Sequence, residues 1–241
     1  MQVASRSDIG RVRTNNEDSL WVDEPQGLLI VADGMGGHAG GEVASTVAIE
    51  AIVSHMQENL ARSDTAGQAM MLLQAAIRRA DEAIWTAARA RRELRDMGTT
   101  VVLALCRGDQ AHIAHVGDSR AYLLQQGELR PLTEDHSVVA ELITAGQLTP
   151  KKARVHPLRH LITRHLGSRT AVADLHTVTW GHGDYLLLCS DGLTTMVEDR
   201  HIQNLILREG TDIQAACEAL IGQANANGGQ DNISVILAYR G

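Results

Sequence analysis

The chain has 241 residues, of which 44% are hydrophobic and 21% are charged, and its formal net charge is -7 at pH 7. This acidic balance disfavours a nucleic-acid partner, because binding to a phosphate backbone depends on clustered Lys and Arg. The N-terminus lacks the apolar run of a signal peptide, and no apolar run is long enough to span a bilayer. We therefore expect a cytoplasmic protein without membrane insertion.

The hydrophobic pattern predicts short strands and two long helices. Runs rich in Val, Ile and Leu predict strands at residues 28–32, 99–106, 112–116, 121–125, 185–189 and 233–239. Helical spacing of apolar residues predicts long helices at 41–61 and 66–94, with shorter ones at 141–145, 201–208 and 213–223. Strands and helices do not alternate, so we expect an antiparallel α+β fold in one domain spanning 1–241.

The cysteines do not indicate a disulfide framework or a zinc site, and the arginine-rich segment does not indicate a nucleic-acid-binding surface. The three cysteines, Cys106, Cys189 and Cys217, are far apart and lie in predicted strands or a helix, which indicates reduced core thiols. Arginines 89, 91, 92 and 95 alternate with acidic and apolar residues. That pattern is typical of a solvated helix face rather than of a nucleic-acid-binding surface.

Aspartates stand at the ends of four predicted strands. Asp33, Asp118 and Asp191 follow apolar runs, and Asp231 precedes the last one. Any single Asp-Gly is explained by a turn. If all four converge, however, their charges repel in a partly desolvated place, and a bound cation removes that cost. Hard oxygen ligands favour Mg²⁺ or Mn²⁺, and a pair of such ions hydrolyses phosphate esters by activating water.

The segments on either side of the first strand add to this pattern. Arg13 precedes Glu17 and Asp18, and a guanidinium group can bind phosphate through paired hydrogen bonds, although a surface ion pair is the competing interpretation. The glycine-rich stretch 34–41 opens a helix and allows close backbone approach to an ion. It matches neither a Walker loop nor an EF-hand.

Together, eight blocks in order resemble the PPM family of metal-dependent protein phosphatases, the type 2C class, and especially its compact bacterial members. They are residues 11–18, 31–38, 98–100, 115–120, 132–137, 163–167, 188–193 and 229–233. The resemblance implies a four-layer α-β-β-α sandwich of two antiparallel sheets flanked by helix pairs, with a flap subdomain near 138–165. It also implies a Mn²⁺- or Mg²⁺-dependent phosphatase that removes phosphate from phosphoserine and phosphothreonine by attack of a metal-activated water.

The resemblance implies a role for each matching aspartate. Asp33 is expected to bridge the two ions of the core site, and the carbonyl of Gly34 to bind the second ion. Asp191 and Asp231 are expected to bind the first. Asp118, together with Asp191, matches a weaker third metal site of the bacterial members.

The remaining implied roles concern the solvent and the substrate. Glu17 and Asp18 are expected to act through metal-bound waters, and Arg13 to bind the phosphate. Eukaryotic members carry a histidine two residues after the bridging aspartate, where this chain has Met35. His38 is the nearest alternative and the expected general acid.

The expected flap carries the basic residues Lys151, Lys152, Arg154 and Arg159, which attract phosphorylated substrates. His156 and His160 have a zinc-like spacing, but Pro157 separates them and no third ligand is near, so we interpret them as solvated or core residues. The expected partners are phosphorylated proteins, including a cognate Ser/Thr kinase of bacterial signalling and its substrates. No nucleic-acid partner is expected, and the chain is expected to be a monomer.

Two other classes stay open. A phosphatase-shaped regulatory module without turnover is disfavoured because Asp33, Asp191 and Asp231 are all present. A metal-dependent phosphodiesterase or nuclease shares the two-ion chemistry, but it needs a basic track that the charge balance does not provide.

Overall fold

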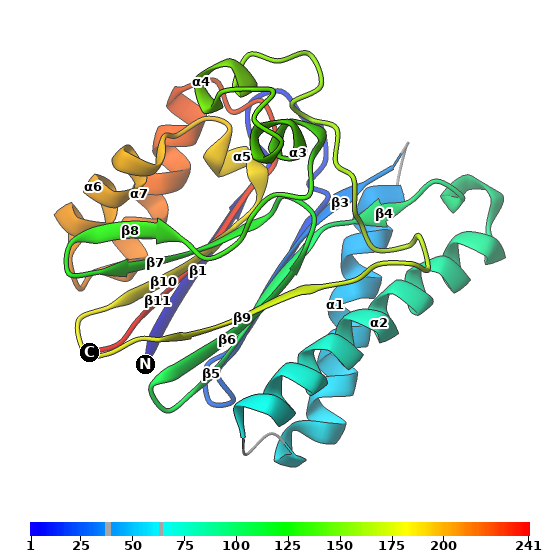
Figure 1. Ribbon diagram of the computed structural model, residues 1–241, viewed down its shortest axis with the longest axis horizontal. Helices are drawn as coiled ribbons and strands as arrows, with labels where there is room; N and C mark the ends of the chain where they lie inside the picture. Colours follow the sequence, from blue (N-terminus) through cyan, green and yellow to red (C-terminus); the bar gives the residue numbers. More distant parts are fainter. Residues whose placement is uncertain (37–39, 63–64) are drawn as a thin grey trace.

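A computed structural model describes residues 1–36, 40–62 and 65–241. Two antiparallel sheets lie face to face between two layers of helices (Figure 1). The first sheet has the order β2 (Asp18–Asp23), β3 (Leu28–Met35), β5 (Val101–Arg107), β6 (Gln110–Val116) and β9 (Asp174–Thr179), and β4 (Gly98–Thr99) pairs with β3. The second has the order β1 (Gln2–Asp8), β11 (Ile233–Tyr239), β10 (Tyr185–Cys189), β7 (Arg120–Gln125) and β8 (Glu128–Pro131).

The helices cover the outer faces of both sheets. The first sheet is covered by α1 (Gly40–Asn59) and α2 (Ala66–Ala90), which are followed by the 3-10 helices η1 (Leu60–Arg62) and η2 (Arg92–Leu94). The second is covered by α6 (Asp199–Glu209) and α7 (Ile213–Ala226). The short helices α3 (Val138–Thr144), α4 (Pro150–Ala153) and α5 (Asp191–Thr194) gather at one end of the sandwich (Figure 1).

The strand β3 shows why the central strands are apolar throughout. Leu28 and Ile30 pack beneath α1 and α2, whereas Leu29 and Val31 pack between the two sheets. A strand covered on both faces has no polar side, so its sequence does not alternate. On α2, Leu73 is fully buried in the same helix-sheet layer, and its replacement by Ala would cost about 2–5 kcal/mol.

The predicted α+β sandwich is confirmed, and the strands that the sequence did not predict have a common cause. The strands at 185–189 and 233–239 match β10 and β11, but β1, β2, β8 and β9 were not predicted. These four are the edge strands of the two sheets. Edge strands keep many side chains exposed, as in β1, so they lack an apolar run that would reveal them.

The bounds of other elements also differ from the prediction, and the helix expected at 141–145 is α3 at 138–144. The strand predicted at 99–106 is divided into β4 and β5, which flank Thr100. The long helices end earlier than predicted, at Asn59 and Ala90, and each is followed by a 3-10 helix. No helix in the described ranges is both long and apolar enough to cross a bilayer.

Candidate metal centre

The strand ends of both sheets meet around a cavity of about 490 Å³. Its wall includes the four aspartates at strand ends, Asp33, Asp118, Asp191 and Asp231, together with the predicted Arg13 and Glu17. The predicted Asp18 is not among the residues of this wall. Gly34 lines the same cavity. Asp33 belongs to the first sheet, whereas Asp191 and Asp231 adjoin strands of the second. The fold therefore brings together carboxylates that are far apart in the sequence.

The backbone of Asp33 is held on both sides by the turn between β4 and β5. Its N–H group donates to the Thr100 hydroxyl at 3.3 Å, and its carbonyl accepts from the Thr100 N–H at 2.9 Å. The Thr99 hydroxyl donates to the same carbonyl at 2.8 Å. These bonds fix the position from which the Asp33 side chain enters the cavity.

Gly34 follows Asp33 where three chain segments meet closely. A Cβ atom at this position would lie 2.1 Å from the Gly41 carbonyl oxygen and 2.6 Å from that of Glu17. The Gly34 N–H group donates to the Glu17 carbonyl at 3.1 Å. Only glycine fits between the start of α1 and Glu17, and this close contact places the Glu17 carboxylate at the cavity.

Asp18 lies at the start of β2 and has one carboxylate oxygen without a partner. Its Oδ2 atom accepts from the Ser190 hydroxyl at 2.8 Å, and the Ser190 oxygen accepts from the Ser234 N–H at 3.0 Å. Its Oδ1 atom is buried and has no hydrogen-bond partner in the described part of the chain. A buried carboxylate oxygen left unpaired is costly, so this atom is available to a cation or to a water that donates to it.

Burial and mutual repulsion make the carboxyl groups at this site hard to ionise. Removal from water raises the pKa of Asp18 to about 7, that of Asp118 to about 8 and that of Asp191 to about 6, and neighbouring aspartates add to each shift. The same causes raise the pKa of Asp33 well above its ordinary value. Divalent cations would offset both costs, and the all-oxygen donor set fits Mg²⁺ or Mn²⁺.

Arg13 and Asn232 organise the N-terminal side of the cavity. The Arg13 guanidinium donates to Asp231 Oδ2 at 2.7 Å, and 47% of its side chain is exposed. The Asn232 side chain accepts from the Glu17 N–H at 2.8 Å and donates to the Asn15 carbonyl at 3.0 Å. The residue after Asp231 therefore holds the loop that carries Arg13 and Glu17.

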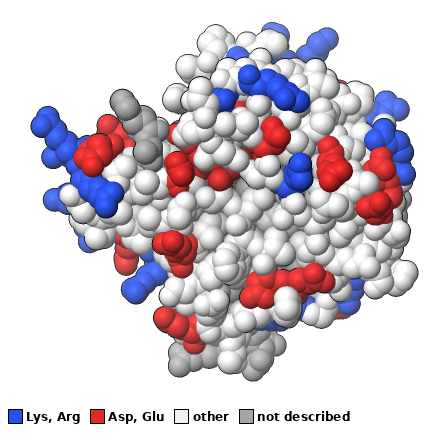
Figure 2. All heavy atoms as spheres, turned by 180° about the vertical axis from the view of Figure 1, so that it is seen from behind, with Lys and Arg blue, Asp and Glu red and all other residues white. Residues whose placement is uncertain are grey.

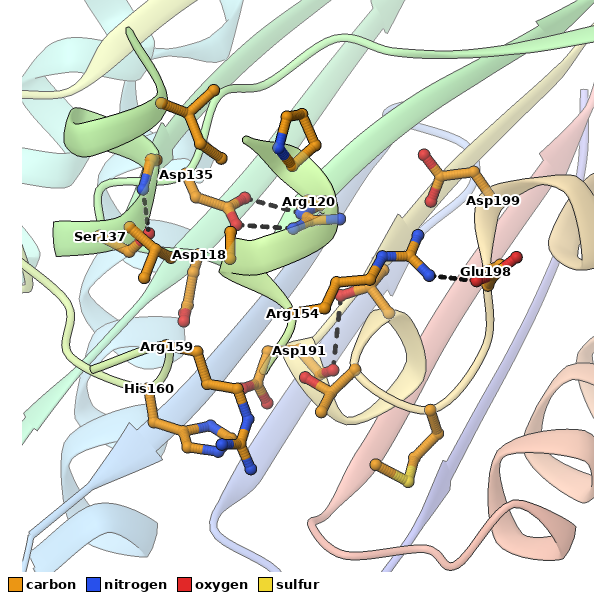
Figure 3. Close-up of a pocket in the computed structure, with 18 of the residues that line it drawn as sticks. Asp118, Arg120, Asp135, Ser137, Arg154, Arg159, His160, Asp191, Glu198 and Asp199 are labelled. Carbon is orange, nitrogen blue, oxygen red and sulfur yellow. Dashed lines mark hydrogen bonds and ion pairs between the residues drawn. The ribbon is translucent and has the colours of Figure 1, made fainter. Parts of the chain in front are cut away.

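A second cavity of about 510 Å³ adjoins the first, between the predicted flap and α5–α6. Both cavities share Asp118, His160 and Asp191 (Figure 3). Arg154 of the flap segment forms an ion pair with Glu198 at the start of α6 (Figure 3). The segment 138–165 is closed by hydrogen bonds at its base, with the Val138 N–H donating to the Leu161 carbonyl at 2.9 Å.

His115, His136 and Asp174 form a separate cluster whose potential ligand atoms lie within 4.8 Å of one another. The Gly117 N–H donates to His136 Nδ1 at 3.1 Å, so the proton of a neutral His136 is on Nε2. That nitrogen lies 3.1 Å from Asp174 Oδ2 and donates to it. His136 therefore has no lone pair free for an ion, and His115 stacks on its ring while its own Nε2 bonds to the Glu134 carbonyl at 2.9 Å.

Several positions at the site were not assigned from the sequence. Thr100, Ser190 and Asn232 lie within the matching blocks, but their supporting contacts depend on residues distant in the sequence. His160 was interpreted as a solvated or core histidine, and the structure places it in the cavity wall. No pattern in the sequence marks that position. The expected general acid His38 lies outside the described residues.

Comparisons with known proteins agree with this geometry. A family model for protein phosphatase 2C matches residues 9–237. The chain is 41% identical to the serine/threonine phosphatase stp of Listeria innocua, covering 100% of this chain and 96% of that protein. The Streptococcus agalactiae serine/threonine phosphatase structure matches with 36% identity and a TM-score of 0.91, covering 100% of this chain and 99% of that one.

One further structure bears on the metals. The catalytic domain of the serine/threonine protein phosphatase PstP, solved in complex with two manganese ions, is 37% identical and matches with a TM-score of 0.87. The match covers 98% of this chain and 96% of that chain. The family resemblance is thus confirmed, and the chain belongs to the protein phosphatase 2C family of metal-dependent serine/threonine protein phosphatases.

Proposed function

We propose that the cavity at the strand ends is the phosphatase active site, with Asp33, Gly34, Asp191 and Asp231 holding two Mn²⁺ or Mg²⁺ ions. The convergence of carboxylates from both sheets on one cavity is the observation that carries this proposal. When bound, the ions supply an activated water and neutralise charge on the phosphoryl oxygens. The substrates are phosphoserine and phosphothreonine in proteins.

Three further carboxylates, those of Asp118, Glu17 and Asp18, complete the proposed site. Asp118 lines both cavities together with Asp191, so we assign this pair to the weaker third metal site. Glu17 and Asp18 are assigned to the waters around the ions. The unpaired Oδ1 atom of Asp18 supports that role, because a water is a hydrogen-bond donor that can reach a carboxylate oxygen.

Arg13 is the proposed phosphate-binding residue. A guanidinium group has about five N–H donors, and Asp231 accepts only one hydrogen bond from Arg13 in this structure. Half of the side chain is exposed at the cavity. The remaining donors can therefore bind phosphoryl oxygens and hold the substrate in position for attack.

The proposed partners follow from the substrate chemistry. Phosphoserine and phosphothreonine are made by Ser/Thr kinases, so a cognate kinase and its substrates are the proposed partners. Turnover requires one copy of the cavity, to which all the proposed ligands are supplied by a single chain. We therefore propose a monomeric enzyme, which light scattering after size-exclusion chromatography tests.

Hydrolysis of a phosphothreonine peptide tests the function directly. We expect turnover with Mn²⁺ and none with excess chelator. The isosteric change Asp33→Asn should lower kcat by roughly 10³-fold, because it removes the ligand proposed to be shared by both ions. Full turnover in chelator, or near-normal turnover by a folded Asp33→Asn variant, would contradict the proposed site.

A further inference from the structure

Two arginine side chains stack on Trp85 of α2. The guanidinium carbon of Arg89, one helical turn later, lies 4.7 Å from the centroid of the indole ring. That of Arg169, from the loop before β9, lies 4.6 Å from the same centroid. Cation–π contacts of this kind order side chains that are otherwise mobile in water.

The backbone of Arg169 is held in a conformation that non-glycine residues rarely adopt. Its φ angle is 64°, in the left-handed region. The buried carboxylate of Asp81 accepts hydrogen bonds from the N–H groups of Gly167 at 2.6 Å, Arg169 at 3.0 Å and Ala171 at 3.2 Å. One helix thus supplies both the carboxylate that fixes the loop and the ring on which Arg169 stacks.

The two stacked arginine side chains lie at the surface of the protein. Both side chains are exposed, and neither has an ion-pair partner within the described ranges. Basic side chains gather where α2 and η2 end, at the left of Figure 2, with a few acidic ones among them. The formal charge of the chain is -7, so this cluster is a local exception. Arg89 is exposed, as expected for a solvated helix face, and its guanidinium group also stacks on Trp85.

The loop that carries Arg169 begins at the metal cavity. Ile162 lines that cavity, and Leu166 forms two backbone hydrogen bonds with Thr99, at 3.3 and 2.8 Å. An extended chain spans at most about 3.6 Å per residue, so the backbones of Ile162 and Arg169 lie within about 25 Å of each other. A polypeptide whose phosphorylated residue is in the cavity can therefore reach the stacked arginines.

We propose that Trp85, Arg89 and Arg169 form a docking site for an acidic segment of the phosphoprotein substrate. This proposal rests on the proposed phosphatase function of the cavity. A guanidinium group binds a carboxylate through two parallel, charge-assisted hydrogen bonds, and stacking on Trp85 holds each of the two groups in place before the substrate arrives. The site selects substrates that carry Glu or Asp within about 25 Å of the phosphorylated residue, a distance that about seven extended residues cover.

The kinetic test compares three substrates. They are a phosphothreonine peptide with a distant Glu tract on either side, the same peptide with Gln in place of Glu, and p-nitrophenyl phosphate. For the double variant Arg89→Gln/Arg169→Gln we expect about a 10-fold higher KM for the acidic peptide at low salt, with kcat unchanged. Kinetics with the Gln peptide and with p-nitrophenyl phosphate should not change.

A matched control removes the same charge from the opposite side of the sandwich. Arg130→Gln/Arg200→Gln alters exposed arginines on β8 and α6, and it should leave the KM for the acidic peptide unchanged. Equal KM values for wild type and Arg89→Gln/Arg169→Gln would overturn the docking site. So would an equal loss with all three substrates, because that result would place the effect in the cavity.

A binding measurement separates this proposal from the phosphatase function. In nitrogen-15-labelled protein, an unphosphorylated Glu-rich peptide should shift the indole N–H resonance of Trp85, assigned by its loss in Trp85→Phe. The shift should disappear in Arg89→Gln/Arg169→Gln. No shift in the wild type, or a shift only with a single-stranded oligonucleotide, would overturn the proposal. Failure of the phosphatase function would instead appear as absent turnover with Mn²⁺.

Discussion

Asp18 lies directly opposite Asp33 in the antiparallel pair of β2 and β3. The two carboxyl groups thus come from facing positions of neighbouring strands, and the Asp18 charge raises the free-energy cost of ionising Asp33, which is already withdrawn from water. In the absence of cations, the folded protein reduces this cost by keeping protons on some of these groups. Proton binding and metal binding are therefore alternatives at the same site.

The stability of the metal-free protein should fall as the pH rises. Because the pKa values of Asp18, Asp118 and Asp191 are raised to about 7, 8 and 6, the folded state holds protons that the unfolded state has lost. Stability present at low pH is then lost as the pH passes through these folded-state values. Thermal melts in chelator should show Tm decreasing between about pH 5 and pH 8.

Mn²⁺ provides the control for that experiment. Its stabilising effect on Tm should grow with pH, because the cation binds the ionised carboxylates. A Tm in chelator that rises steadily over the same pH range would contradict this account of the site.

Asp18→Asn should make the metal-free protein more stable and the enzyme less active. The amide keeps the size of the side chain and removes a carboxylate whose Oδ1 atom has no partner. At pH 8 in chelator we expect the free energy of unfolding to increase by about 1–2 kcal/mol, measured by urea denaturation. Turnover with Mn²⁺ should fall by about 10²-fold. A destabilised Asp18→Asn protein would show that the Ser190 contact outweighs the charge repulsion.

Arg13→Ala should weaken the handling of phosphate without removing the ions. We expect kcat/KM for a phosphothreonine peptide to fall by about 10–100-fold, the loss typical of charge-assisted hydrogen bonds. Isothermal titration should give Mn²⁺ affinity no weaker than in wild type, because Asp231 loses a competing ion pair. Unchanged kinetics would leave Arg13 with a structural role as the partner of Asp231.

Replacement of His38 tests the identity of the general acid. A serine or threonine alkoxide needs a proton to leave, whereas nitrophenolate does not. His38→Ala should therefore slow phosphopeptide hydrolysis about 10²-fold more than p-nitrophenyl phosphate hydrolysis. His160→Ala is the matched comparison, because His160 lines the cavity. The selective loss appearing in His160→Ala instead would assign the acid role to His160.

The sequence predicted the parts of the fold and site that depend on local pattern. Apolar runs predict the central strands, and Asp33, Asp191 and Asp231 stand next to the ends of these runs. Edge strands carry no such pattern because one side of each lacks a neighbouring strand. Contacts such as Asn232 with Glu17 join distant segments, so only the folded chain reveals them.

The same limit applies to the Trp85 stack. One of its two arginines lies in α2 and the other in the loop before β9, and several strands separate the two in the sequence. Neither the stacking of both guanidinium groups on one indole ring nor the hydrogen bonds that the Asp81 carboxylate accepts can be inferred from spacing. A run of arginines in a helix has the same composition whether or not its members are held in place.

Both sheets carry their acidic site residues at the same end of the sandwich, so the contacts between the sheets differ from that end to the other. Near Asp33, Asp191 and Asp231 the sheets meet at charged groups, whereas deeper in the sandwich they meet at side chains such as Leu29 and Leu186. Apolar packing is independent of metal, but the charged end is not. Metal removal should therefore loosen one end alone, and amide hydrogen exchange should accelerate there first while the opposite end of each strand stays protected.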